Sequence, residues 1–203
     1  MSYSNLKDSV YLYLGYKNKK YDESIDNIID ECLLEVEKLA QFKYMYMEFN
    51  YLIPILEKEA YQKFLKGSTN YYLCAMTLGR AISDKIRYYS KLNMQKMVIF
   101  DACASAYLEY LSDKYQNDNL GNDLSFRFCP GYGNTSVKDL KEIVKYLDIK
   151  KIGIELLDSC IMIPEKSMIG IIYHNKNIKK SCEGCIKEKE CDLRKDGITC
   201  YKK

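Results

Sequence analysis

Residues 127–133 read Arg-Phe-Cys-Pro-Gly-Tyr-Gly and begin at the end of a predicted short strand at 125–128. The guanidinium of Arg127 is planar and can bind a carboxylate through two parallel hydrogen bonds. Gly131 has no Cβ, so a ligand can approach the backbone closely there. Tyr132 offers an aromatic face to a cation or a purine, and a hydroxyl as a polar anchor. The segment therefore suits a ligand with a carboxylate, a cationic sulfur and a purine, although the same residues are equally typical of a surface turn.

Outward from this segment, apolar periodicity and turn residues predict helices and strands that do not alternate regularly. Because no repeated strand-helix-strand unit is present, the pattern indicates an α+β fold. The helices are expected at 7–16, 22–40, 54–65, 79–92, 93–115 and 137–147, and the strands at 42–53, 71–78, 125–128, 151–157 and 168–174.

The chain of 203 residues is long enough for one domain with a sizeable core and a short appendage. From about Asn175 onward the composition changes to lysine, glutamate and cysteine, with few large apolar residues. We therefore expect a folded domain at 1–176 and a cysteine-rich C-terminal appendage at 177–203.

Charge and motif content argue against several classes of protein. The formal net charge is only +3, and neither sign forms a long block, so a nucleic-acid partner is not favoured. No apolar run approaches the roughly 20 residues that span a bilayer, and the N-terminus has no signal-peptide core, so no membrane partner and a cytoplasmic location are expected. His174 is the single histidine, which disfavours a histidine-based catalytic triad. Phosphate-loop and dinucleotide-binding fingerprints are both missing from the sequence.

The run from Arg127 to Tyr132 resembles the S-adenosylmethionine-binding R-x-x-x-G-Y motif of the activation domain of cobalamin-dependent methionine synthase. Other segments are similar to small stand-alone members of that family in the same order. They are 10–16, Thr77-Leu78-Gly79 with Asp84, 101–106 with Glu109, and 162–167 with Gly170.

This resemblance implies a twisted, mainly antiparallel sheet with flanking helices. It also implies that the chain binds S-adenosylmethionine and supports reductive remethylation, or reactivation, of cob(II)alamin on a methionine synthase acting in trans. The partner would be the cobalamin-binding module of the synthase, which supplies the cobalamin. The chain would then be an accessory subunit with no complete active site of its own.

The resemblance assigns ligand binding to Arg127, Gly131 and Tyr132, with Pro130 shaping the turn. A further contact is expected from the helix that carries Ser105 and Glu109, where the family has an acidic residue. Ser105 falls at that acidic position here and Glu109 follows one turn later, so the acidic contact is shifted. Residues Asp101, Ser105, Glu109 and Asp113 share one face of this helix because they recur every four residues. A solvated stripe explains the same pattern.

Four cysteines near the C-terminus, Cys182, Cys185, Cys191 and Cys200, could hold zinc or an iron–sulfur cluster. Their spacing matches neither a regular ferredoxin run nor a paired zinc ribbon, and a reduced tail or a redox dithiol is the alternative. Nearby lysines and arginines could dock an acidic flavodoxin or ferredoxin, or form a solvated charge run. Two other functions stay open, namely a metal-binding redox module and a reactivator of another corrinoid methyltransferase.

Overall fold

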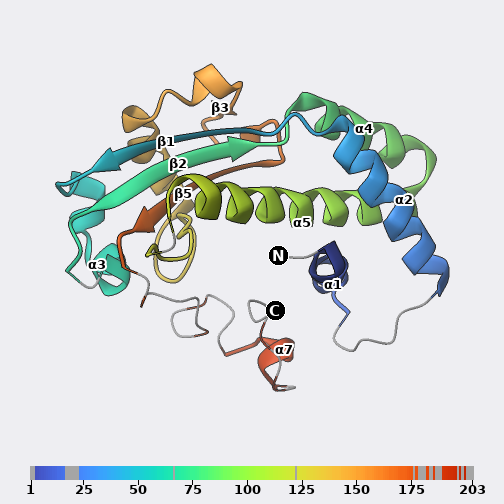
Figure 1. Cartoon of the computed structure of the whole chain (residues 1–203), viewed down its shortest axis with the longest axis horizontal. Helices are drawn as coiled ribbons and strands as arrows, with labels where there is room; N and C mark the ends of the chain where they lie inside the picture. The colour runs from blue at the N-terminus through green and yellow to red at the C-terminus, as the bar shows by residue number, and fades with distance from the viewer. Residues whose placement is uncertain are drawn as a thin grey trace.

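The computed structural model describes residues 3–16, 23–65, 67–121 and 123–175, and beyond these only 177, 182, 185, 189–195, 197 and 199. The main sheet has three antiparallel strands in the order β1-β2-β5 (Figure 1). These strands are β1 (Lys43–Phe49), β2 (Tyr71–Thr77) and β5 (Ser167–Tyr173). The connection from β2 to β5 spans residues 78–166 and contains the longest helix of the described chain.

Strand β2 lies at the centre because its sequence is apolar on both sides of the pleat. All seven of its residues are buried, as expected for a strand covered on both faces. Successive side chains point to opposite faces, so Cys74 and Met76 join one core while Leu73 and Ala75 join the other. The sheet therefore separates two hydrophobic cores.

Four helices cover one face of the sheet. They are α1 (Tyr3–Tyr13), α2 (Glu23–Leu39), α4 (Arg80–Leu92) and α5 (Met94–Asn119). Helix α5 has 26 residues, about 39 Å at the usual rise per residue, and runs along the sheet in Figure 1. Small buried residues at its centre, such as Ala104 and Ala106, let neighbouring helices such as α2 pack closely against it.

The second core lies on the other face, under short elements. These are η1 (Pro54–Glu57), α3 (Glu59–Leu65), η2 (Val137–Asp139), α6 (Leu140–Ile143), η3 (Val144–Tyr146), η4 (Ile149–Ile152), β3 (Glu155–Leu156) and β4 (Met162–Ile163). The two short strands pair with each other as a small hairpin. Among the described residues after β5, the structure gives a short helix, α7 (Asp192–Lys195).

The predicted α+β class with an antiparallel sheet is confirmed, but several predicted bounds are wrong. Helix α5 continues to Asn119 through the polar stretch expected to be a loop. The helix expected at 137–147 is divided into η2, α6 and η3, and the one at 54–65 is interrupted by an extended residue, Lys58. The strand expected at 151–157 is reduced to β3, because Gly153 adopts a left-handed conformation with φ of +79° and ends η4.

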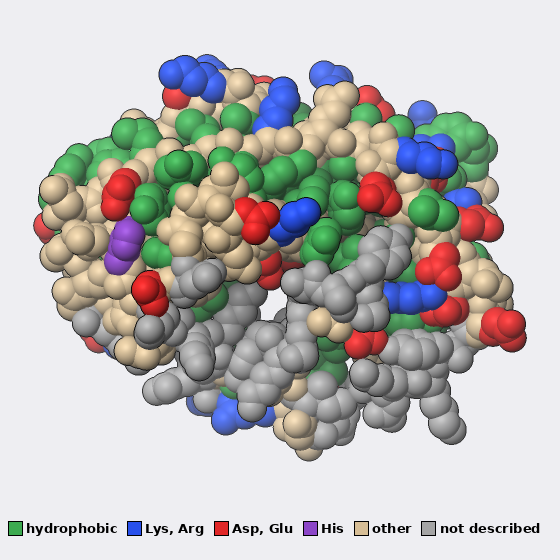
Figure 2. Space-filling view, viewed as in Figure 1, with side chains coloured by type: hydrophobic (Ala, Val, Ile, Leu, Met, Phe, Trp, Pro, Cys, Tyr) green, Lys and Arg blue, Asp and Glu red, His purple; other side chains and the backbone are tan. Residues whose placement is uncertain are grey.

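The surface and the C-terminal region add two findings. On the face shown in Figure 2, acidic and basic side chains are interspersed and not gathered by sign. In the described part of the chain, no helix combines the length and the apolar character needed to cross a bilayer. Most of 177–203 lies outside the described residues, so the expected boundary at 176 stays a prediction.

Candidate functional site

The segment that contains Arg127 lies along the outer edge of β5. Phe128 and Ile171 form an antiparallel bridge through two backbone hydrogen bonds of 2.8 Å each, and the N–H of Ser125 donates to the carbonyl of Tyr173 at 2.9 Å. The predicted strand at 125–128 is thus a single bridge. Its extended backbone still alternates faces, so Phe128 joins the second core and Arg127 points to the face covered by α5.

Arg127 is bonded to three side chains of α5. Its Nη2 donates to Glu109 Oε2 at 3.0 Å and to Asp113 Oδ1 at 2.6 Å, and its Nη1 donates to Gln116 Oε1 at 3.1 Å. Only 4% of the Arg127 side chain is exposed. The Nε atom is buried and has no hydrogen-bond partner among the described residues. The planar fork expected to hold a ligand is therefore already engaged with acceptors of the chain itself.

The charge on Arg127 is stabilised by its neighbours. Burial by itself would lower the pKa of Arg127, but Asp113 and Glu109 outweigh it and hold that pKa above its ordinary value. Removing a buried cation from such a cluster would leave carboxylates without a counter-charge, which is costly. Arg127, Glu109, Asp113 and Gln116 form one cluster, called the Arg127 cluster below. This cluster links the sheet edge to α5 and contains the guanidinium expected to bind a ligand.

Gly131 and Tyr132 form the turn that follows. Gly131 has φ of +98°, and a Cβ there would lie 2.8 Å from Val137 Cγ2. Its N–H donates to Thr135 Oγ1 at 3.0 Å, and the Thr135 hydroxyl donates to the Tyr132 carbonyl at 2.7 Å. The backbone conformation and the contact with Val137 thus both require glycine at this position. This requirement explains Gly131 by the turn alone, and it is also compatible with ligand binding.

Tyr132 is the exposed member of the motif. Its side chain is 44% exposed, and its ring packs edge-on against Phe128 with 6.0 Å between ring centroids. Its pKa is raised, first by the neighbouring Cys129, then by burial and by Glu109. The hydroxyl is protonated at neutral pH, as in any tyrosine, and can donate a hydrogen bond. Pro130, by contrast, is buried.

Ser105 belongs to a second polar cluster on the same face of α5. Lys166 Nζ lies 2.8 Å from Ser105 Oγ and 2.8 Å from Asp101 Oδ1. Lys166 directly precedes β5, where the Ser167 hydroxyl makes hydrogen bonds of 2.8 Å with Thr77 Oγ1 and 2.6 Å with the Pro164 carbonyl. The expected ligand contact at Ser105 is therefore occupied by a lysine.

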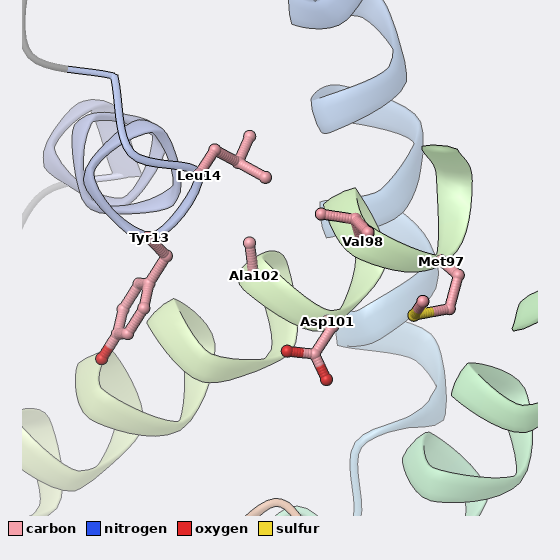
Figure 3. A pocket seen from close by; sticks show the side chains of 6 residues that line it. All are labelled: Tyr13, Leu14, Met97, Val98, Asp101 and Ala102. Atoms are coloured by element: carbon pink, nitrogen blue, oxygen red, sulfur yellow. The ribbon is translucent and has the colours of Figure 1, made fainter. Parts of the chain in front are cut away.

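A groove lies between the end of α1 and the first half of α5. It has a volume of about 280 Å³ and is lined by Tyr13, Leu14, Met97, Val98, Asp101 and Ala102 (Figure 3). This volume is just below the roughly 300–1,000 Å³ typical of ligand pockets. Asp101 lies eight residues before Glu109, or about 12 Å along the helix axis. The groove and the Arg127 cluster thus lie at two places along α5, about two turns apart.

The expected metal site lies partly outside the described residues. Cys200 lies outside the described residues, whereas Cys182 and Cys191 are half-buried and Cys185 is exposed. Among the described residues, no group of three or more histidine, cysteine, aspartate or glutamate side chains is placed to hold a metal ion. The zinc or iron–sulfur site stays a prediction.

The structure adds three residues to the candidate site, Asp113, Gln116 and Lys166. Asp113 carried a signal in the sequence, because it continues the four-residue repeat of Asp101, Ser105 and Glu109. Gln116 lay in a stretch expected to be a loop. No feature of the sequence distinguished Lys166 from the other lysines as a partner of α5.

Comparison with solved structures gives a likeness of fold. The crystal structure titled as the MetH reactivation domain bound to AdoHcy matches with a TM-score of 0.56, over 96% of this chain and 83% of that chain. Sequence identity is 14%, so this likeness shows the fold alone. Comparisons with protein-family models and with curated proteins found no match.

Proposed function

We propose that the chain binds S-adenosylmethionine at the Arg127 cluster and supports reductive remethylation of cob(II)alamin on a cobalamin-dependent methionine synthase acting in trans. One observation carries the proposal. The R-x-x-x-G-Y segment lies at the sheet edge with Arg127 directed at α5, in a fold similar to a reactivation domain crystallised with AdoHcy. The buried Nε of Arg127, without a partner among the described residues, is a donor that a ligand carboxylate would satisfy.

The side chains around Arg127 match the three charged groups of this ligand. A guanidinium pairs with a carboxylate through two bonds. Glu109, on α5 beside Arg127, supplies negative charge for the ammonium. The half-exposed ring of Tyr132 offers an aromatic face that attracts a cation. Because S-adenosylmethionine carries a net positive charge, the acidic face of α5 favours it.

The chain's own part is to bind and orient the methyl donor. Arg127 fixes the amino-acid end of the ligand, and Tyr132 stands on the exposed side where a second protein can approach. The cobalamin-binding module of the synthase supplies the corrinoid, which accepts the methyl group once it is reduced. A flavodoxin or ferredoxin would deliver the electron, and all these partners are expected in the cytoplasm.

Titration calorimetry with S-adenosylmethionine tests the binding step. Tyr132→Ala should weaken binding by about 1–2 kcal/mol through loss of the aromatic face. Tyr51→Ala is a matched control, since Tyr51 is also exposed, at 56%, but follows β1, which β2 separates from β5 and the Arg127 segment. Equal affinity in the two variants, or no binding by the unaltered protein, would count against the proposal.

The reactivation step needs a second assay. A cobalamin-dependent methionine synthase that lacks its activation domain, with its corrinoid in the cob(II)alamin state, is mixed with S-adenosylmethionine and a chemical reductant. Addition of this chain should restore the absorption spectrum of methylcobalamin. Failure with the synthase but success with a different corrinoid methyltransferase would move the proposal to that partner.

A further inference from the structure

The three acceptors that hold Arg127 differ in how firmly the fold keeps them. Gln116 is 8% exposed, and its amide nitrogen also donates to the carbonyl of Ser125 at 3.0 Å. The side chain of Glu109 is 19% exposed, whereas that of Asp113 is 45% exposed. A half-exposed carboxylate keeps part of its hydration, so it loses least when it leaves an ion pair. Asp113 is therefore the acceptor that can most readily leave.

The donors of Arg127 are also used unevenly. Nη2 serves both Glu109 and Asp113, while the buried Nε has no hydrogen-bond partner among the described residues. The fork formed by Nε and Nη2 matches the two oxygens of one carboxylate. Asp113 is bonded through Nη2 alone. A ligand carboxylate that used both donors would satisfy a buried group that Asp113 leaves unsatisfied.

We propose that Asp113 is an internal competitor for the ligand's carboxylate. It occupies Nη2 of Arg127 while no ligand is bound, and it returns to solvent when the carboxylate binds. Glu109 stays in place beside the ammonium group of the ligand. The inference rests on the proposed function, because the displaced carboxylate competes with that of S-adenosylmethionine. Since binding must first break an existing ion pair, the measured affinity is lower than that of an open guanidinium.

Titration calorimetry with S-adenosylhomocysteine tests the competition. This ligand keeps the carboxylate and the ammonium but has no sulfonium charge. Loss of an acidic residue therefore changes the long-range attraction to this ligand less than it changes the attraction to S-adenosylmethionine. Asp113→Ala should bind it about threefold to tenfold more tightly than the unaltered chain. Asp118→Ala is the matched control, because it removes the same charge from an exposed position of α5. Its affinity should stay within about twofold, since solvent screens an exposed charge.

A second ligand separates the carboxylate from the nucleoside. 5′-Methylthioadenosine has the same nucleoside and sulfur but no amino-acid group, so its affinity should be equal in all three proteins. Circular dichroism checks that each protein is folded. Arg127 keeps Glu109 and Gln116 as partners in Asp113→Ala, and we therefore expect that variant to fold.

The outcomes distinguish the inference from the proposed function. Equal or weaker binding of S-adenosylhomocysteine by Asp113→Ala overturns the competitor role, and the proposed function stands. Binding that is detectable only in Asp113→Ala supports the competitor role. No binding by any of the three proteins overturns the proposed function and the competitor role with it.

Discussion

Two cations face α5 from the edge strand and its flanking turns, and they are held differently. Arg127 is 4% exposed and bonded to three side chains of the helix. Lys166 is 13% exposed and contacts Asp101 and Ser105. These two residues lie about two turns closer to the N-terminus of α5 than the partners of Arg127 do. Asp101 beside Lys166 and Asp113 beside Arg127 are each 45% exposed, whereas Glu109 beside Arg127 is 19% exposed. The same helix face thus carries a cluster built on a buried arginine and a more solvated pair.

The difference indicates separate roles. Solvent screens the Lys166 pair, so it contributes little to stability. The Arg127 side chain is almost fully removed from solvent and Glu109 is largely so, and the loss of Arg127 would therefore leave the Glu109 carboxylate without compensation. A ligand carboxylate would gain most by binding Arg127, because the hydrogen-bond donors of Arg127 are shielded from water.

The largest effect is expected from Arg127→Ala. It should lower the free energy of unfolding by about 3–5 kcal/mol, because Glu109 and Gln116 lose a buried partner. Urea unfolding followed by circular dichroism measures the change. Arg127→Lys keeps the charge but loses the planar fork, so it should be less harmful. A loss below about 1 kcal/mol in Arg127→Ala would mean that the cluster is no more than a surface pair.

Gly131→Ala should have the next largest effect, since it alters the turn that follows Arg127. The positive φ and the 2.8 Å approach to Val137 should together cost about 2–3 kcal/mol. Gly153→Ala is the matched control, with φ of +79° and no atom within 4 Å of the added Cβ. It should cost about 1 kcal/mol. Addition of Val137→Ala to Gly131→Ala should recover part of the difference, and no recovery would show that the backbone angle alone matters.

Lys166→Ala should cost about 1 kcal/mol or less. Its effect should also shrink in about 1 M salt, where the screening length is roughly 3 Å, while that of Arg127→Ala should persist. Parallel urea titrations at low and high salt make the comparison. An equal loss for the two substitutions would remove the distinction between the clusters.

The smallest effect is expected from Ser105→Ala. The hydroxyl bonds Lys166 and also donates to the carbonyl of Asp101 at 3.0 Å, but alanine is the better helix former. The two effects should nearly cancel and leave a change of about 0.5 kcal/mol or less. Affinity for S-adenosylmethionine should stay the same. A clear loss of affinity would restore Ser105 as a ligand contact.

Much of the fold followed from local patterns. The uninterrupted apolar run at Tyr71–Thr77 has the composition of a covered central strand, and β2 is one. The direction of Arg127 also follows from local geometry, because strand alternation separates it from Phe128. Short 3-10 segments such as η4 were not predicted, since tertiary packing and a single glycine, Gly153, set their bounds.

The candidate site was only partly predictable for a physical reason. The residue types at Arg127, Gly131 and Tyr132 indicated a ligand with a carboxylate. That Asp113 and Gln116 reach the same guanidinium depends on how α5 lies against β5, which no local pattern contains. Gln116 in particular belongs to a polar stretch that, on composition alone, is typical of a loop.

A crystal structure of the chain with bound S-adenosylhomocysteine tests the central claim most directly. We expect the ligand's carboxylate within hydrogen-bond distance of Arg127 Nη2 and Nε, with Asp113 turned to solvent and Glu109 unmoved. A ligand bound elsewhere, with the Arg127–Asp113 hydrogen bond intact, would contradict the account.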